Sequence, residues 1–237
     1  MTLPKLDKPI FELEVPSTGK KIKYTCFTVK QEKILLIAQE AKDQKDILNA
    51  VTQIVEQCVL DPIDSNKLIP ADLEYIFLKL RARSVNNIVE LKYRDKEDNK
   101  VYDFDLDLDS IVPSKPNKKV SNKVMLSKDI GIEVRWPNIE DVSFVADNIK
   151  EKEEAETFYK MLSRCIIKLW DATKVYDLST VSEEEMNEFM GQLTFEHTSK
   201  IKEYFDQMPK LKHTLKYKNS MGNDRTIELE GLQDFFQ

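Results

Sequence analysis

The chain has 237 residues, of which 41% are hydrophobic and 33% charged, with 42 acidic residues against 36 basic ones and a formal net charge of −6. This composition is typical of a globular protein with a buried core, and no apolar run approaches the roughly 20 residues of a membrane-spanning helix, so we expect no membrane partner. The negative net charge also opposes binding of nucleic acid over the whole surface.

The N-terminal part predicts a β-hairpin followed by two amphipathic helices. The segments IFELEV and KIKYTCF alternate polar and apolar residues around the turn PSTGK, so Glu12 and Glu14 are predicted to lie opposite Lys21 and Lys23. Apolar residues then recur at helical spacing in two stretches that end before Pro62.

The segment DLEYIFLKLRAR, residues 72–83, predicts a helix with two apolar faces. The first face comprises Leu73, Ile76, Phe77 and Leu80, and the nearly opposite face comprises Tyr75, Leu78 and Ala82. Burying an apolar side chain contributes roughly 1.5–3 kcal/mol, against about 0–1 kcal/mol for an exposed ion pair, so the apolar faces decide where this helix lies. Either both faces are covered within the chain, or the second face binds a partner. Tyr75, Leu78 and Ala82 are therefore candidate partner-binding residues.

A second hairpin is predicted from NIVELKYRD and KVYDFDLDLDS, joined by KEDN. Asp103, Asp105 and Asp107 line one side of it. They do not match a calcium loop, because the sixth position counted from Asp103 is leucine instead of glycine and the twelfth is serine instead of glutamate. The next stretch, residues 113–123, has two prolines, four lysines and no acid, and is predicted to be a loop or linker.

The second half begins with the strand-like segment GIEVRW. An amphipathic helix is predicted over residues 151–169, with charged residues at four-residue steps on its exposed face. Ser182 and Glu185 form a capping box that opens another helix. These three segments predict a second mixed region of strand and helix.

A third hairpin is predicted at the C-terminus, from HTLKYK to RTIELE across NSMGND. Lys216 and Lys218 are predicted to face Glu228 and Glu230 across it. Like the other two hairpins, it alternates polar and apolar residues and has charges of opposite sign on its two strands.

Antiparallel hairpins interleaved with amphipathic helices predict an α+β fold. The predicted organisation is an N-terminal α+β region over residues 1–112, the Lys/Pro-rich linker or loop 113–123, and a C-terminal α+β region over residues 124–237 that ends in a hairpin. This arrangement allows two subdomains.

The sequence offers no motif for catalysis, metal binding or cofactor binding. The three cysteines and two histidines are scattered singly, which predicts neither a zinc site nor a disulfide framework. The five glycines lack the spacing of a phosphate-binding loop. We therefore expect no catalytic residue, no metal and no cofactor.

Two other classes of function stay open. One is an enzyme with an active site assembled from distant acidic residues, for instance Glu133, Glu140 and Asp141 around Trp136. The other is a nucleic-acid accessory protein that uses the lysines within residues 115–128, although these lysines lack interleaved aromatic residues and are more typical of a solvated loop.

Three segments carry a resemblance to a known family: GKKIKYTCFTVKQEKILLIAQEAKD, DLEYIFLKLRARSV, and the closing MPKLKHTLKY with IELEGLQDFF. With them the chain resembles the baseplate hub assembly proteins of T-even-type contractile-tailed bacteriophages, from about residue 4 to the C-terminus. The resemblance rests on the overall succession of segments and brings no catalytic residue with it.

The resemblance implies a non-enzymatic phage protein that is made in the host bacterial cytoplasm and helps to build the hub of the tail baseplate. It would act as an assembly factor or a minor hub component in the virion tail, including as a chaperone for the tape-measure or hub proteins, which would be its partners. Phe235 and Phe236, two large apolar residues near the chain end, complete the candidate partner-binding set. Their alternative role is to fold back on the core.

Overall fold

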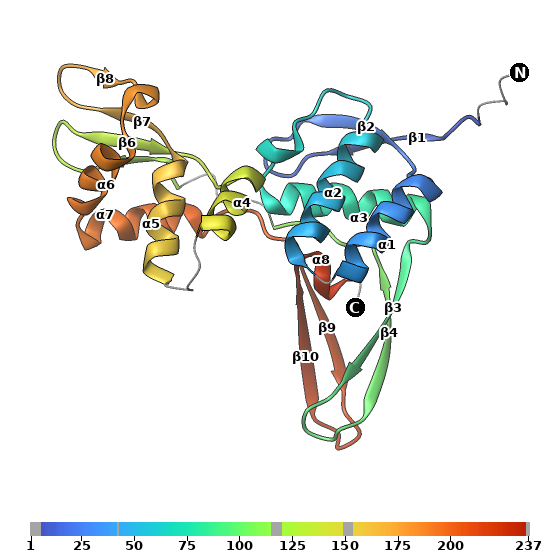
Figure 1. Ribbon diagram of the computed structural model, residues 1–237. Helices are drawn as coiled ribbons and strands as arrows, with labels where there is room; N and C mark the ends of the chain where they lie inside the picture. The colour runs from blue at the N-terminus through green and yellow to red at the C-terminus, as the bar shows by residue number, and fades with distance from the viewer. Residues whose placement is uncertain (1–5, 42, 115–119, 149–153, 236–237) are drawn as a thin grey trace, which may run out of the picture. The chain divides into compact units, whose positions relative to one another are not determined.

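The computed structural model of the chain describes residues 6–41, 43–114, 120–148 and 154–235. It confirms the α+β fold, with helices and antiparallel sheets (Figure 1). The chain divides into two compact units. Unit 1 comprises residues 1–114 and 209–237, and unit 2 comprises residues 115–208.

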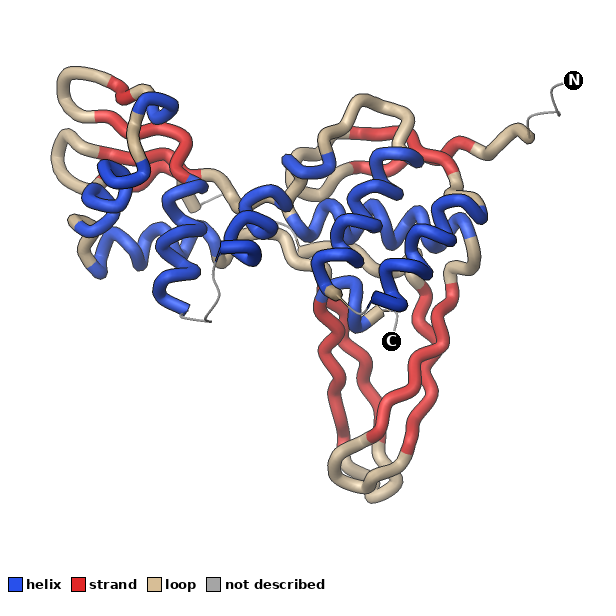
Figure 2. The backbone as a smooth tube through the Cα atoms, in the orientation of Figure 1, coloured by secondary structure: helices blue, strands red, loops and turns tan. Residues whose placement is uncertain are grey.

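Unit 1 combines helices with three two-stranded hairpins, β1–β2, β3–β4 and β9–β10. In chain order its elements are β1 (Ile10–Glu14), β2 (Lys21–Thr25), α1 (Val29–Ala41), α2 (Gln44–Cys58), the 3₁₀ turn η1 (Ser65–Lys67), α3 (Pro70–Ser84), β3 (Ile88–Arg94), β4 (Val101–Asp107), β9 (Lys212–Lys218), β10 (Asp224–Glu230) and α8 (Gly231–Asp234). Helix α2 packs against both α1 and α3, and hairpins β3–β4 and β9–β10 extend away from these helices (Figures 1 and 2).

The first hairpin has the predicted register. Glu12 pairs with Lys23 and Glu14 with Lys21, so the charged side chains face each other as the sequence indicated. The turn between the strands is attached to α3, because Ser17 donates hydrogen bonds from its backbone N–H and its hydroxyl to the carboxylate of Asp72. This attachment also supplies Asp72, which is buried in the first turn of α3, with polar partners.

The third hairpin has a different register from the predicted one. Lys216 pairs with Thr226 and Lys218 with Asp224, and Glu228 faces Thr214. The ion pairs that form are therefore Lys212 Nζ to Glu230 Oε2 at 2.8 Å and Lys218 Nζ to Asp224 Oδ1 at 3.6 Å. The prediction was wrong because alternation fixes which face a residue occupies, while the turn length fixes which residues meet across the hairpin.

Unit 2 is built on a four-stranded antiparallel sheet in the order β5–β6–β7–β8. Its elements are β5 (Lys123–Met125), β6 (Gly131–Val134), α4 (Ile139–Asn148), α5 (Glu154–Cys165), β7 (Ile166–Trp170), β8 (Val175–Tyr176), the 3₁₀ turn η2 (Leu178–Thr180), α6 (Glu183–Gly191) and α7 (Phe195–Phe205). The core of unit 2 includes Ile132, Leu162 and Ile201, all with 0% exposure. The predicted capping box of Ser182 and Glu185 is present at the start of α6.

The helix predicted over residues 151–169 is shorter than expected and leads directly into a strand. Its described part, α5, ends at Cys165, and residues 166–170 form β7; residues 151–153 lie outside the described residues. The segment IIKLW is rich in β-branched and aromatic residues, which favour strands, and it pairs with β6. The helical pattern continues through Ile166 and Leu169, so periodicity alone did not reveal the transition.

The predicted regions 1–112, 113–123 and 124–237 differ from the two units. The end of unit 1's first segment, Ser114, lies inside the predicted linker, but residues 209–237 join unit 1 instead of the second half. The backbone N–H of Ser114 donates to the carbonyl of Lys210 at 3.0 Å, and the N–H of Lys210 donates to Ser114 Oγ at 2.9 Å. The C-terminal hairpin also contacts the turn of hairpin β3–β4, more than a hundred residues earlier in the sequence.

Gly131 gives a first testable prediction. It lies opposite Trp170 across β6 and β7, and a Cβ atom at Gly131 would be 2.3 Å from Trp170 Cζ2. We expect Gly131→Ala to lower the free energy of unfolding by roughly 1–3 kcal/mol, because the new methyl group would overlap the Trp170 indole and force that side chain to move. Urea unfolding measures the change. The control is Gly191→Ala, where no atom other than those of the chain neighbours and the backbone of its own helix lies within 4 Å of the new methyl group. Equal effects of the two substitutions would contradict the explanation.

Candidate functional site on the paired hairpins

The candidate site of unit 1 is the pair of hairpins β3–β4 and β9–β10, which we call the paired hairpins. Along each strand every second side chain points inward, toward the other hairpin. The inward residues include Leu91, Leu106, Leu215, Ile227 and Leu229, which belong to or pack against one core cluster. Because each hairpin buries only one face, the two hairpins need each other to cover their apolar residues.

The tips of the two hairpins are joined by a hydrogen-bond network centred on Asp95. Asp95 is fully buried at 0% exposure and accepts hydrogen bonds from the Tyr217 hydroxyl and from Arg225 Nε, the latter at 3.0 Å. The hydrogen bond from Tyr217 is the largest effect that lowers the pKa of Asp95, with backbone N–H groups and Arg225 adding to it against the opposing effect of burial. The carboxylate is therefore held charged and fixes hairpin β9–β10 to hairpin β3–β4.

Further bonds at the tips fix the two turns against each other. Asn219 Nδ2 and Asn223 Nδ2 donate to the two oxygens of Glu97 at 2.6 and 2.8 Å, and the backbone N–H of Ser220 donates to Asp98 Oδ2 at 2.9 Å. The Tyr102 hydroxyl donates to the same oxygen of Asp98 at 2.6 Å. As Figures 1 and 2 show, the hairpins converge at these turns, so the network sets their relative position at the end farthest from the helices.

Four aromatic rings fill the space just inside the tips. The Tyr217 ring lies 4.8 Å from Tyr102, 5.4 Å from Phe104 and 6.4 Å from Tyr93, measured between ring centroids. Burial and the hydrogen bond to Asp95 raise the pKa of Tyr217 to about 12, so its hydroxyl stays a donor at physiological pH. The rings therefore give the paired hairpins a rigid outer end.

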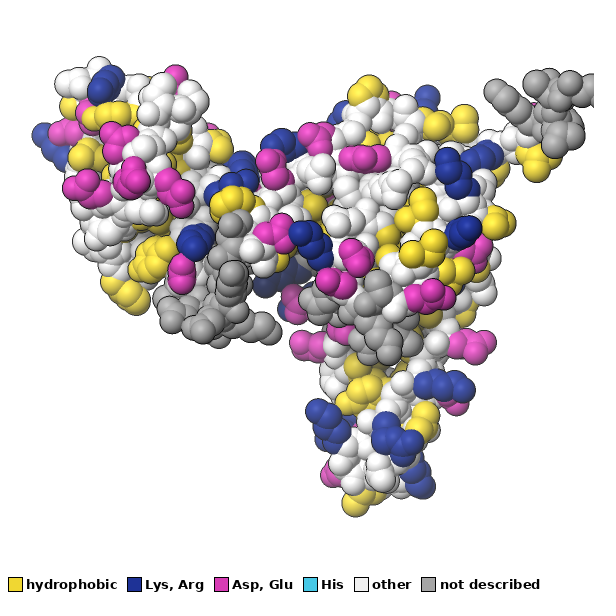
Figure 3. All heavy atoms as spheres, in the orientation of Figure 1, with side chains coloured by type: hydrophobic (Ala, Val, Ile, Leu, Met, Phe, Trp, Pro, Cys, Tyr) yellow, Lys and Arg dark blue, Asp and Glu magenta, His cyan; other side chains and the backbone are white. Residues whose placement is uncertain are grey.

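A cavity of about 200 Å³ lies between the hairpins, nearer to the helices. Its lining comes from all four strands and from the start of the C-terminal helix: Leu91, Lys92, Tyr93, Phe104, Leu215, Ile227, Glu228, Leu229 and Asp234. Most of these side chains are apolar, and the charged ones are Lys92 and two acids. On the visible side of the paired hairpins, charged side chains of both signs surround hydrophobic ones (Figure 3).

At the base of the paired hairpins, Glu74 of α3 contacts the start of α8. Its carboxylate accepts a hydrogen bond from the backbone N–H of Leu232, and Glu74 Oε1 would lie 3.4 Å from a Cβ at Gly231, whose φ is +75°. Burial raises the pKa of Glu74 to about 7, with a further contribution from the nearby charge of Glu230. The side chain therefore changes charge close to neutral pH.

The structure places most of the predicted partner-binding residues in the core of unit 1. Leu78 and Phe235 have 0% exposure and Ala82 has 6%, and all three belong to the cluster that the hairpins cover. Tyr75 is partly buried and packs against this cluster, while Phe236 lies outside the described residues. Of the two alternatives for helix 72–83, the structure shows both faces covered within the chain. Our proposals therefore rest on other residues.

The basic residues of this helix also have structural roles. Lys79 Nζ donates to the carbonyl oxygens of Leu108 and Asp109, both at 2.9 Å, and Arg83 Nη2 lies 3.1 Å from Asp109 Oδ1. Burial lowers the pKa of Lys79. Both residues hold the chain as it leaves β4, so they secure the base of the hairpin.

The acidic residues considered for an enzyme are engaged in contacts within unit 2. Asp141 is 1% exposed, and its carboxylate lies 3.0 Å from Arg164 Nε and accepts hydrogen bonds from Arg135 and from the backbone N–H of Asn138. Burial pushes the pKa of Asp141 upward, but these hydrogen bonds outweigh burial and lower it. Asp141 is thus held charged as a link between α4, α5 and the chain after β6.

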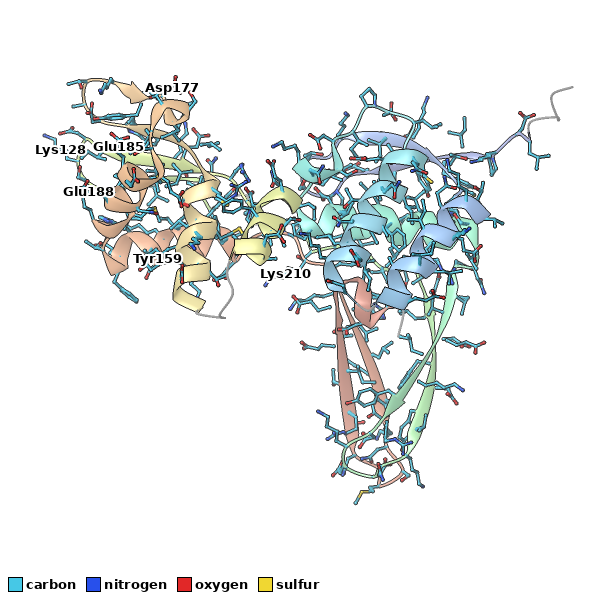
Figure 4. The ribbon with its side chains drawn as sticks, in the orientation of Figure 1. Lys128, Tyr159, Asp177, Glu185, Glu188 and Lys210 are labelled. Atoms are coloured by element: carbon cyan, nitrogen blue, oxygen red, sulfur yellow. The ribbon has the colours of Figure 1, made fainter. Side chains whose placement is uncertain are left out.

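Glu133, Trp136 and Lys128 have the following surroundings. Glu133 accepts a hydrogen bond from Asn122, and Trp136 Nε1 donates to the carbonyl of Tyr204 at 3.2 Å, with the two rings stacked. Within 115–128, residues 115–119 lie outside the described residues, and Lys128 points outward from the β5–β6 turn (Figure 4).

Metal-binding groups and membrane-spanning helices are both absent from the described residues. In this part of the chain, no group of three or more His, Cys, Asp or Glu residues is arranged to hold a metal ion. No helix among the described residues has the length and apolar character to cross a membrane.

The paired hairpins could not be found from sequence alone. Each hairpin was visible as an alternating pattern, but nothing in the pattern shows that the two apolar faces pack together or that a cavity remains between them. The two hairpins are about 120 residues apart in the sequence, so no local pattern links them. The sequence indicated only that each hairpin has an apolar face that another element must bury.

Comparison with known proteins identifies one family. The family model of the T4 bacteriophage base plate protein matches residues 8–237, nearly the whole chain. No curated protein and no solved structure matches the chain.

Proposed function

The chain therefore belongs to the T4 bacteriophage base plate protein family, and from this membership we propose that it is a non-enzymatic assembly factor or minor component of the baseplate hub. It acts through protein–protein contacts. Its partners are other hub proteins or the tape-measure protein, for which it serves as a chaperone in the host bacterial cytoplasm while the tail is built.

The observation that carries this proposal is the form of the paired hairpins. Each hairpin is a separate two-stranded sheet, so each of the four strands has one edge without a strand partner among the described residues. The tip network and the aromatic cluster hold these edges in fixed positions, next to a mostly apolar cavity. Rigid strand edges beside an apolar cavity are suited to capturing another protein chain.

The partner surface proposed here differs from the one that the sequence suggested. Leu78, Ala82 and Phe235 support the paired hairpins from within, and the hairpins carry the surface that meets a partner. Deleting residues 232–237 would thus remove Phe235 from the core as well as any contact that the chain end makes. Truncation is for this reason a poor test of partner binding.

The test of this function is an infection by a phage in which the gene is disrupted and the protein is supplied from a plasmid. Without the plasmid we expect tail components to accumulate without sedimenting as baseplates, and with it we expect baseplates to reappear. Mass spectrometry of purified virions then separates a minor component, which is retained, from an assembly factor, which is absent. Normal baseplates without the protein would refute the proposal.

A further inference from the structure

The outer edge of β10 is open to an additional strand. The N–H of Asn219 donates to the carbonyl of Asn223, and the N–H of Gly231 donates to the carbonyl of Leu211. In an antiparallel pair, hydrogen-bonded residue pairs alternate with pairs that are not hydrogen-bonded, so every second pair between 219/223 and 211/231 joins β9 to β10 by hydrogen bonds. The residues between them, Asp224, Thr226, Glu228 and Glu230, consequently direct their backbone N–H and C=O groups away from β9. Asp234 Oδ2 accepts the N–H of Glu230 at 2.9 Å. Asp224, Thr226 and Glu228 remain for another strand, since β10 pairs with no other strand in the described chain.

The side chains along this edge are acidic. Asp224, Glu228 and Glu230 are exposed on the outer face of β10, with Thr226 as the only neutral residue between them. Asp224 and Glu230 pair with lysines of β9, whereas Glu228 has no ion-pair partner in the part of the chain that the structure describes. A strand added to this edge would therefore be favoured by basic side chains on the outer face.

The cavity lies beside the same strand. Three consecutive residues of β10, Ile227 to Leu229, line it, as do three of β3, while β4 and β9 contribute only Phe104 and Leu215. An apolar cavity of roughly 150 Å³ takes up benzene, so a cavity of about 200 Å³ has room for one large apolar side chain. Glu228 and Asp234 outnumber Lys92 in its lining, which again favours a basic partner.

Strand β9 shows which pattern of side chains can pair with β10. On the opposite edge of β10, β9 alternates the outward residues Lys212, Lys216 and Lys218 with the inward residues Leu215 and Tyr217. Lys212 and Lys218 form ion pairs with Glu230 and Asp224 of β10, and the apolar residues of β9 enter the space between the hairpins. A segment of the same pattern on the free edge would meet the same acidic row and the cavity.

We propose that the free edge of β10 binds an extended segment of a partner protein in which lysine or arginine alternates with large apolar residues. The segment adds a strand to β10, places one apolar side chain in the cavity between the hairpins, and sets a basic side chain against Glu228. That the partner is another baseplate protein rests on the proposed function. A second copy bound edge to edge through β10 is disfavoured, because the two acidic rows would repel each other.

The experiment uses the full chain and a fluorescein-labelled peptide that copies residues 211–219, LKHTLKYKN. A second peptide has glutamate in place of each lysine, and a third has the same composition without alternation. Fluorescence anisotropy is expected to show binding of the first peptide only. Hydrogen exchange is expected to slow at the backbone N–H groups of Asp224, Thr226 and Glu228.

Two variants locate the binding site. Glu228→Lys is expected to weaken binding by about tenfold or more, because like charges then face each other. The matched control Asp105→Lys makes the same charge change on the exposed face of β4 and should leave binding unchanged. Leu215→Trp fills the cavity and should block binding while the free energy of unfolding is kept or raised.

Several results would overturn the inference. They are binding of all three peptides alike, equal effects of Glu228→Lys and Asp105→Lys, no binding at all, or a concentration-dependent dimer that Glu228→Lys abolishes. Failure of the proposed function would be seen separately, as normal baseplates in the gene disruption. If the disruption blocks assembly but Glu228→Lys restores baseplates fully, only the strand-addition site is refuted.

Discussion

Replacing Leu78 with aspartate is expected to unfold unit 1. Leu78 has 0% exposure and lies in the cluster formed by α3, the paired hairpins and Phe235. Removing a buried leucine side chain costs about 2–5 kcal/mol, and a buried carboxylate without a partner adds several kcal/mol more. The total approaches the 5–15 kcal/mol that typically stabilises a whole domain. Circular dichroism and the dispersion of amide signals in NMR spectra measure the loss.

The control for this substitution is Leu36→Asp on α1. Leu36 is 53% exposed, so the same chemical change should alter the free energy of unfolding by less than about 1 kcal/mol. A Leu78→Asp protein that stays folded but no longer binds its partners would show that this helix face is a partner surface. It would thereby return Tyr75, Leu78 and Ala82 to the candidate site.

The pattern of helix 72–83 shows how far sequence reasoning reached. Its two apolar faces were visible from the spacing of Leu73, Ile76 and Leu78, and both faces are buried. What the spacing did not contain was the identity of the covering element. Apolar periodicity predicts that a face is covered but not by which element. The face of Leu78 and Ala82 is covered by the hairpin β3–β4, which follows the helix directly, by the distant hairpin β9–β10, and by Phe235.

Strands were predicted more reliably than their partners. The alternation of IFELEV and KIKYTCF gave both the strands and the register of the first hairpin. In the last hairpin the same reasoning gave the strands but placed Lys216 and Lys218 opposite the wrong residues. The cavity beside β10 depends on packing between hairpins, so no local pattern could predict it.

Two carboxylates of unit 1, Asp95 and Glu74, lie at opposite ends of the paired hairpins. Asp95 fixes the tips through Tyr217 and Arg225, and the hydrogen bond from Tyr217 lowers its pKa, which favours the charged form. Glu74 fixes the base through Leu232, and its pKa of about 7 makes that contact sensitive to pH near neutrality. A change of pH near neutrality therefore affects the stability of the paired hairpins at their base. These hairpins carry the proposed partner surface.

Substituting Glu74 with glutamine is expected to remove a pH dependence of stability. The pKa of Glu74 is about 7 in the folded protein against an ordinary value of 4.5, so between these values the folded chain holds a proton that the unfolded chain has released. Stability therefore falls as pH rises through this window, by roughly 3 kcal/mol in total, and the loss is complete above pH 7. Glutamine stays neutral and can still accept the N–H of Leu232.

Urea unfolding between pH 5 and pH 8 checks this expectation. Wild type and Glu74→Gln should be similarly stable at pH 5, and the variant should become the more stable protein as pH rises, because ionised Glu74 is partly buried and lies near the charge of Glu230. Taking the difference between the two proteins cancels the titration of other groups. Glu90→Gln, at an exposed carboxylate on β3, is the matched control and should run parallel to wild type. Parallel curves for Glu74→Gln as well would mean that its carboxylate is solvated, and that the start of α8 is held by the packing of Leu232 and Phe235 alone.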